Sequence, residues 1–279
     1  MDAAHGPGID TPAGYTRLQR TGTGAGADVY RAWDERAGRW AVLRLFHRYL
    51  GGRAEEAAFA AYCAATVQLG RNPSIVPVRY GGITATGRPW LALDLVDGRT
   101  LAEAEPPSPA ESLHLVIILA DALAWAHSMR PPIAHGRLRP EHILLDASGA
   151  PLLTEFAAPI GTSAPAPGDD VVQLTLLLFH LLTGHVWPGG DDREISIWPG
   201  LSLLVDQALA PIPQVDTMAE FAVRLREVRR AAGVPQPAAP EAPPVVPPDT
   251  ELPHRKIVRR GWAALLARTI FRTDSGLRD

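Results

Sequence analysis

AHGRLRPEHILLD, at residues 134–146, is the most informative segment of the chain. A regular frame of His, Leu, Pro and aliphatic residues runs through it, and three basic side chains stand within that frame: Arg137, Arg139 and His142. Arginine stays protonated in proteins, so Arg137 cannot accept a proton. The segment therefore carries fixed positive charge within an otherwise apolar frame.

Composition sets the broad class. The chain has 279 residues, is 46% hydrophobic and carries a net charge of −3, which indicates a globular protein that does not bind nucleic acid in bulk. A single cysteine, Cys63, excludes an intrachain disulfide framework and favours a reducing, cytoplasmic location. No stretch reaches the roughly 18 apolar residues that a membrane span needs. The longest apolar run, Leu113 to Ala126, contains Asp121 and is typical of a buried helix.

Composition also divides the chain into segments. A flexible leader is expected first, followed by a strand-rich lobe, a helical lobe, a Pro-rich linker and a basic amphipathic tail, at residues 1–13, 14–97, 98–232, 233–253 and 254–279. Within the two lobes the clearest expected elements are strands at 28–33 and 40–46 and helices at 55–69 and 112–127.

Together with the loop at 134–146, six motifs in order and at matching spacing resemble those of the protein-kinase-like family, most closely bacterial serine/threonine kinases. They are the glycine-rich loop GTGAGADVYRAWD (22–34), the third strand GRWAVLRLF (38–46), NPSIVPVRYGG (72–82), the hinge WLALDLVDGRTLAE (90–103), LLTEFAAP (152–159), and DDVVQLTLLLFHLLTGHVWP (169–188). The resemblance covers Tyr15 to Arg230. It implies an α+β, two-lobed fold with a shortened activation segment, since only about fifteen residues separate Glu155 from Asp170 and no Ala-Pro-Glu motif is present.

The resemblance also implies which residues would contact a nucleotide. In the family a glycine loop, a lysine and a hinge do so, and these functions fall on Gly22, Gly24, Val29, Arg44, the gatekeeper Leu93, and the hinge residues Asp94 and Val96. Arginine keeps the charge of the lysine but not its shape. Arg44 is therefore either a phosphate clamp or a residue tolerated at a disused site.

The catalytic positions implied by the resemblance are altered. The base aspartate falls on Arg137, a lysine on Arg139, the metal-binding asparagine on His142 and the metal-binding aspartate on Glu155. The glutamate that would hold the lysine falls near Tyr62 or Cys63. Five matched positions, which sum to −1 in an active site, here carry +2 from three arginines and one glutamate, with Asp28 of the glycine loop opposing this locally. Glu155 remains as a weak metal ligand, and His135 and Asp170 keep structural roles.

These substitutions predict a degenerate member of the family, a catalytically inactive pseudokinase that acts as a regulatory scaffold or allosteric partner. No cofactor is required, and any ATP would bind weakly and without metal. Two alternatives remain open: an atypical nucleotide-dependent transferase and a low-activity serine/threonine kinase. The base position discriminates among them, because a working enzyme needs a proton acceptor near Arg137.

The tail predicts an interaction element. Apolar residues including Trp262, Leu265 and Leu266 fall on one face of an expected helix at 254–272, and arginines flank that face. The helix would dock on an unidentified protein partner, on a membrane as a peripheral contact, or on its own kinase-like domain. All three alternatives are open.

Overall fold

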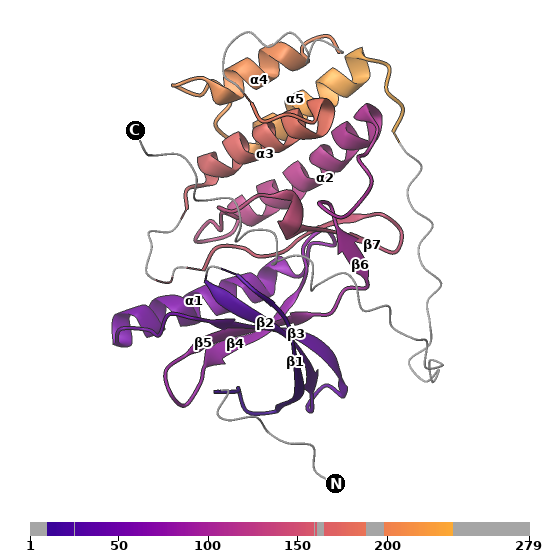
Figure 1. Ribbon diagram of the computed structural model, residues 1–279. Coiled ribbons are helices and arrows are strands. Elements are labelled where there is room, and N and C mark those ends of the chain that lie inside the picture. Colours follow the sequence, from indigo (N-terminus) through magenta and orange to yellow (C-terminus); the bar gives the residue numbers. More distant parts are fainter. Residues whose placement is uncertain (1–9, 25, 159, 161–164, 188–197, 237–279) are drawn as a thin grey trace, which may run out of the picture.

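The computed structural model describes residues 10–24, 26–158, 160, 165–187 and 198–236, and shows two lobes (Figure 1). The N-terminal lobe is a five-stranded antiparallel sheet with one helix, and the C-terminal lobe is helical. This is the two-lobed α+β fold expected from the sequence. The segment 134–146 belongs to the C-terminal lobe.

Five strands form the N-terminal sheet in the order β1-β2-β3-β5-β4. Their bounds are β1 Tyr15–Thr23, β2 Ala27–Asp34, β3 Arg39–Phe46, β4 Val78–Ile83 and β5 Pro89–Asp94. The helix α1, Arg53–Leu69, lies along one face of this sheet (Figure 1). β2 extends the expected strand by one residue at each end, β3 extends it by one residue at its start, and α1 ends at the expected residue.

Alternation along β2 and β3 gives the sheet two different faces, because successive side chains point to opposite sides. Val29 and Val42 belong to a buried cluster that also contains Phe59 of α1 and Leu144 of the other lobe. Tyr30 and Leu43 belong to a separate cluster on the opposite face. The first of these, here called the inner face, therefore looks toward the C-terminal lobe.

Among the described residues, the C-terminal lobe combines a small sheet with four α-helices. The sheet order is β6-β7-β8, and the elements are β6 Gly98–Thr100, α2 Pro109–His127, the 3₁₀ turn η1 Pro140–His142, β7 Ile143–Asp146, β8 Pro151–Leu153, α3 Pro167–Thr183, α4 Leu201–Leu209 and α5 Met218–Ala231. α2 starts with a capping box in which Ser108 and Glu111 satisfy each other's backbone amides. α3 ends at Gly184, which adopts the left-handed conformation common at helix C-termini.

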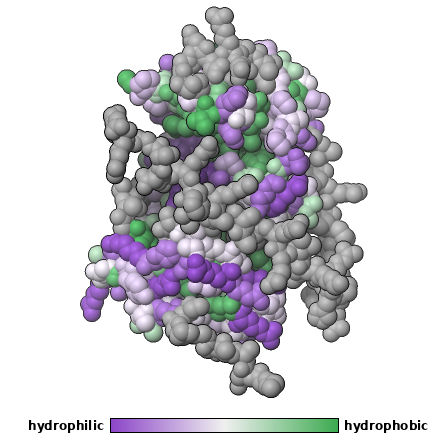
Figure 2. Space-filling model, viewed as in Figure 1, coloured by the Kyte–Doolittle hydropathy of each residue, from purple (hydrophilic) through white to green (hydrophobic). Residues whose placement is uncertain are grey.

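Helix α2 is the centre of the C-terminal core. It packs against α3, α5 and β8, and ten of its residues are buried. By length and composition it is the one helix of the described residues that could cross a membrane, and its apolar residues instead fill the lobe interior. In the space-filling view the visible N-terminal lobe is mostly hydrophilic, whereas apolar side chains gather over parts of the C-terminal lobe (Figure 2).

The end of the expected leader is attached to the sheet. The Asp10 carboxylate accepts hydrogen bonds from the hydroxyls of Thr84 and Thr86, which lie between β4 and β5. Tyr15 opens β1 and its amide donates to the carbonyl of Pro12. Residues 1–9, and the expected linker and tail from residue 237 onward, lie outside the described residues.

Candidate functional site

Asp170 fixes the backbone at the start of the segment 134–146. It lies in the first turn of α3 and is fully buried. Its two carboxylate oxygens accept hydrogen bonds from the backbone amides of His135 and Gly136, each at 2.7 Å, and from Nε2 of His127 at 2.8 Å. A buried carboxylate with three donors is well satisfied. Asp170 thus holds the start of the loop in place.

His135 is locked as a neutral imidazole. Its Nε2 donates to the carbonyl of Thr154 at 2.8 Å, and its Nδ1 accepts from the amide of Arg137 at 3.2 Å. The ring also packs against Phe156, with 4.6 Å between ring centroids. Burial lowers the pKa of His135 to about 4, although Asp170 opposes that shift. His135 therefore joins the loop to the segment that follows β8 and takes no part in proton transfer near neutral pH.

An ion pair closes the cleft between the lobes. Nη2 of Arg44, in the middle of β3 on the inner face, lies 2.8 Å from Oε2 of Glu155. The two side chains are 4% and 14% exposed. These are the positions of the expected phosphate clamp and the expected metal ligand, and here they neutralise each other. The Arg44 guanidinium also lies over the Phe46 ring, 4.9 Å from its centroid.

Tyr62 takes the place where a glutamate was expected on α1. Its hydroxyl donates a hydrogen bond to the carbonyl of Phe156 at 3.1 Å. Burial raises the pKa of this hydroxyl, so it stays protonated and able to donate. Cys63, one residue on, is buried and burial raises its pKa to about 11, which makes it an inert thiol. The helix is thus joined to the other lobe by a neutral hydrogen bond.

The basic residues of the loop differ in their surroundings. Arg137 and Arg139 are exposed, whereas His142 is half-buried. Nδ1 of His142 lies 2.6 Å from the carbonyl of Arg137, which can only accept, so Nδ1 carries the proton. Burial lowers the pKa of His142, and the positive charges of Arg137 and Arg44 act in the same direction. Because Arg44 and Glu155 neutralise each other, the expected charge of +2 is that of two exposed arginines, Arg137 and Arg139.

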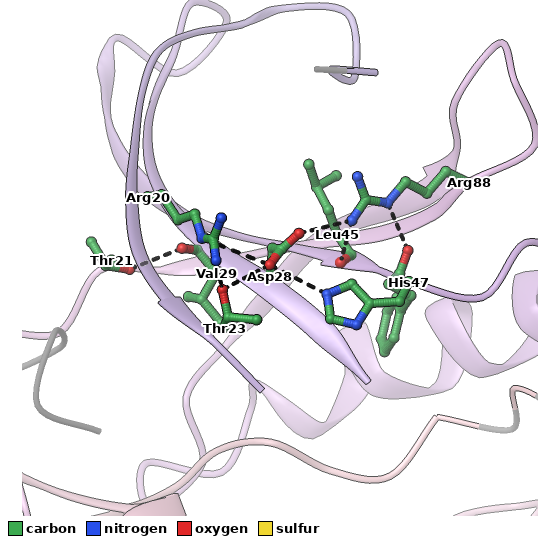
Figure 3. Close-up of polar contacts among 9 residues, drawn as sticks. Arg20, Thr21, Thr23, Asp28, Val29, Leu45, His47 and Arg88 are labelled. Carbon is green, nitrogen blue, oxygen red and sulfur yellow. Dashed lines mark hydrogen bonds and ion pairs between the residues drawn. The ribbon is translucent and has the colours of Figure 1, made fainter. Parts of the chain in front are cut away.

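The glycine-rich turn is closed by contacts on the outer face of the sheet (Figure 3). Thr23 donates to Asp28 Oδ1 at 2.9 Å, and Asp28 also pairs with His47 at 3.3 Å and Arg88 at 3.2 Å. Burial alone would raise the pKa of Asp28, but the hydrogen bonds from these three side chains lower it. The expectation that Asp28 opposes the positive cleft was wrong, because strand alternation points its side chain away from the inner face.

Other expected nucleotide contacts line the inner face and the hinge. Val29 is buried there, and Gly22 and Gly24 lie at the end of β1 and just beyond it. Leu93 lines a small cavity together with Arg44, Tyr62, Glu155 and Phe156. At the hinge, Asp94 pairs through its side chain with Arg39 and Arg79.

Metal ligands are sparse. Within the part of the chain that the structure describes, no group of three or more His, Cys, Asp or Glu side chains could hold a metal ion. Glu155 is the carboxylate at the expected position, and its partner is a cation. Magnesium prefers several oxygen ligands, so these residues do not fit a magnesium ion.

Comparison with known proteins agrees with this architecture. A family model described as the phosphotransferase enzyme family matches residues 17–157. The chain belongs to this family. Among phosphotransferases it is protein-kinase-like. It is 26% identical over 271 residues to the serine/threonine-protein kinase PknK of Mycobacterium tuberculosis, and 29% identical over 253 residues to the serine/threonine-protein kinase PknL of the same species.

The chain spans only part of the length of these relatives. The PknK match spans 80% of this phosphotransferase-family chain but 24% of PknK, and the PknL match spans 78% of the chain and 62% of PknL. The crystal structure of the PknI kinase domain of M. tuberculosis matches with a TM-score of 0.63 and 24% identity, over 80% of this chain and 99% of that domain. This likeness shows the shared fold.

One structural feature of the site was missed by sequence reasoning. Gly136 follows His135 with φ +69°, and a Cβ there would lie 2.5 Å from Cγ of Pro165. Glycine is therefore strongly favoured at the position after His135 while Pro165 lies against it. Both Gly136 and Pro165 are visible in the sequence, but they lie far apart along the chain, and no local pattern indicates that they are in contact.

Proposed function

We propose that this domain is a pseudokinase: a protein-kinase-like member of its family that does not transfer phosphate and acts as a regulatory scaffold or allosteric partner. The observation that carries the proposal is the 2.8 Å pair between Arg44 and Glu155. In kinases, phosphate-binding cations and metal-binding carboxylates must face the nucleotide. Here the two side chains face each other, so neither is free for its role.

The base position supports the same proposal. Arg137 is exposed and permanently charged, and the nearby neutral ring of His142 has its Nδ1 proton committed to the Arg137 carbonyl. Positioned acid–base catalysis is typically worth about 10²–10⁴ in rate. A cation beside the place of the substrate hydroxyl also opposes its deprotonation.

A nucleotide, in this proposal, binds weakly and without metal. Val29 and Val42 from one lobe and Leu144 from the other are buried in a single apolar cluster, and a base would bind by inserting between the two lobes at this cluster. The exposed arginines of the loop favour an anion. Partner binding is assigned to a cytoplasmic protein, with the basic tail at 254–272 as the means of attachment to that protein or to a membrane.

The test is a phosphotransfer assay on the full chain. Purified protein is incubated with labelled ATP and either magnesium or manganese, beside an active serine/threonine kinase domain as the positive control. We expect no autophosphorylation and no labelling of an added protein substrate. Robust autophosphorylation that Glu155→Ala abolishes would overturn the proposal and favour a low-activity kinase.

A companion assay tests the scaffold role. The full chain and a chain ending at residue 236 are compared as bait in a pull-down, because residue 236 is the last one described beyond α5. We expect the full chain to retain a defined protein that the shorter chain loses. Identical profiles for both baits would remove the tail from the proposal.

A further inference from the structure

Arg44 is a buried cation that Glu155 satisfies only in part. The residue is 3% exposed, and Nη2 is the atom that reaches Glu155. Its Nε is buried and has no hydrogen-bond partner among the described residues. A guanidinium presents five donors in a fixed fork that suits two oxygens of one anion. Arg44 therefore keeps unused donor capacity in the wall of the cavity that it shares with Tyr62 and Leu93.

The two partners of this pair are held with unequal firmness. Arg44 lies in the middle of β3 with hydrogen-bonded strands on both sides, opposite Val29 of β2 and Leu91 of β5. Glu155 lies in the irregular segment after β8, and its side chain is 14% exposed, whereas that of Arg44 is 4% exposed. Of the two, Glu155 is the side chain that can leave the contact at lower cost.

The segment around Glu155 is also the bridge between the lobes. The next residue, Phe156, packs on His135 and accepts the hydrogen bond from Tyr62. The amide of Ala157 donates to the carbonyl of His135 at 3.0 Å. These contacts hold the backbone of the segment in place whether or not the Glu155 side chain is paired.

We propose that Glu155 is an internal anion that occupies the phosphate subsite at Arg44, and that an unchelated phosphate group binds by displacing it. The inference rests on the proposed function, because it assumes that the cleft works without metal. The role differs from the one expected for Glu155 from the sequence. A metal ligand would help a metal-bound phosphate to bind, whereas here the Glu155 carboxylate competes with a phosphate for Arg44.

Selection for an unchelated phosphate follows from charge. The Arg44 guanidinium lies 2.8 Å from the Glu155 carboxylate. A divalent cation bound to that carboxylate would therefore be repelled by the guanidinium. Chelation also removes negative charge from the phosphate that Arg44 would attract. A metal-free polyphosphate keeps its full charge and can use both Nε and Nη2 of Arg44.

Competition makes a simple prediction about affinity. A ligand that binds only when Glu155 has left Arg44 has its affinity reduced by the fraction of molecules in that open state. Replacing the Glu155 carboxylate with a neutral amide raises that fraction. Removal of a carboxylate should therefore tighten binding, whereas removal of a metal ligand would weaken it.

The experiment measures binding of ATP and of inorganic tripolyphosphate by calorimetry to the full chain, each in EDTA and in magnesium. We expect Glu155→Gln to bind in EDTA about tenfold more tightly than the wild type, within the range usual for coupled sites. Arg44→Gln should abolish binding of both probes. Glu56→Gln is the matched control, because Glu56 is exposed on α1 and its side chain has no partner among the described residues.

The two probes separate the sources of the phosphate. Tighter binding of ATP alone supports the inference with a nucleotide as the ligand. Tighter binding of tripolyphosphate, alone or with ATP, supports it with the polyphosphate group as the part recognised. Unchanged or weaker binding of both probes by Glu155→Gln in EDTA would overturn it.

A magnesium-dependent result has a separate meaning. If the wild type binds ATP only with magnesium and Glu155→Gln abolishes that binding, Glu155 is a metal ligand and the inference fails. The pseudokinase proposal is then decided independently by the phosphotransfer assay. Should Glu155→Gln not fold, Glu155→Asp takes its place: it keeps the charge but shortens the side chain by one methylene, and unchanged affinity in the folded variant would also overturn the inference.

Discussion

Asp170 and Glu155 are two carboxylates from neighbouring parts of one lobe, and they have opposite kinds of partner. Asp170 is fully buried and accepts hydrogen bonds from two backbone amides and from His127. Glu155 makes one ion pair with a side chain of the other lobe. Groups that hold the backbone are retained in this chain, and groups that would hold a ligand are changed. The fold and the chemistry are therefore separable by mutation.

The largest effect should come from the backbone-holding carboxylate. Asp170→Ala leaves the amides of His135 and Gly136 without an acceptor in a buried site. A buried donor left without an acceptor typically costs about 1–3 kcal/mol, and three donors lose their acceptor here, so we expect the largest loss in the free energy of unfolding among the variants considered. Urea denaturation of the variant and the wild type measures it.

Asp169→Ala is the matched control for this variant. Asp169 is the adjacent residue, is exposed, and accepts one hydrogen bond from the Ala166 amide at the start of α3. Its loss should cost about 1 kcal/mol, as for other contacts at helix N-termini. Equal losses for the two variants would contradict the distinction drawn for Asp170.

The pH dependence of stability is a second test of the same region. His135 has a folded-state pKa of about 4, and Nδ1 faces an N–H donor, so protonation is disfavoured in the fold. The unfolded chain has the ordinary value near 6.5 and binds the proton first. Stability should therefore be complete above about pH 6.5 and fall toward pH 4 by about 3 kcal/mol from this residue.

Denaturation midpoints at several pH values between 7.5 and 4.5 check this expectation. Burial also lowers the pKa values of His114 and His142, which adds loss of the same sign. A His135→Gln variant should show a shallower slope with pH, whatever its absolute stability. A slope equal to that of the wild type would assign the acid sensitivity to other groups.

Sequence reasoning predicted the fold well because the fold depends on local signals. Alternating residues in β2 and β3, the apolar run of α2 and the glycine after α3 each act within a few positions. The order and spacing of the motifs then predicted the two lobes. Resemblance also located Arg44, Glu155 and Asp170 as residues of one site.

The partners of those residues could not be predicted in the same way. The pairing of Arg44 with Glu155 depends on how closely the lobes approach, and no motif records that distance. Tyr62 was noted only for lacking a carboxylate, since a hydrogen bond from its hydroxyl to a backbone carbonyl 94 residues away has no local pattern. Counting charges also gave Arg137 and Arg139 more weight than their exposure supports.

Gly136→Ala should have a smaller effect than loss of Asp170. The new methyl group would lie 2.5 Å from Cγ of Pro165 and 3.5 Å from Cβ of Ala157, and φ is +69°. We expect about 1–3 kcal/mol of destabilisation from backbone strain and overpacking together. Thermal or urea unfolding of the variant measures the sum.

Gly149→Ala separates the two causes. Gly149 has φ +84°, and a methyl group added there would have no neighbouring atom within 4 Å, so this variant reports backbone strain alone. The difference between the two variants is the contribution of Pro165. Equal effects would show that the short segment before α3 does not press on the catalytic loop.

The smallest effect tests the link between α1 and the other lobe. Tyr62→Phe removes the hydroxyl that donates to the Phe156 carbonyl at 3.1 Å and leaves the ring in place. A neutral hydrogen bond contributes about 1 kcal/mol on average, so a loss of that size is expected. Tyr49→Phe is the control, because Tyr49 is 50% exposed and its hydroxyl has no partner among the described residues. A loss of stability well above about 1 kcal/mol for Tyr62→Phe, together with easier proteolysis between the lobes, would mean that this hydrogen bond and the Arg44–Glu155 pair act as one unit. In that case a double variant with Glu155→Gln should lose less stability than the sum of the two single variants.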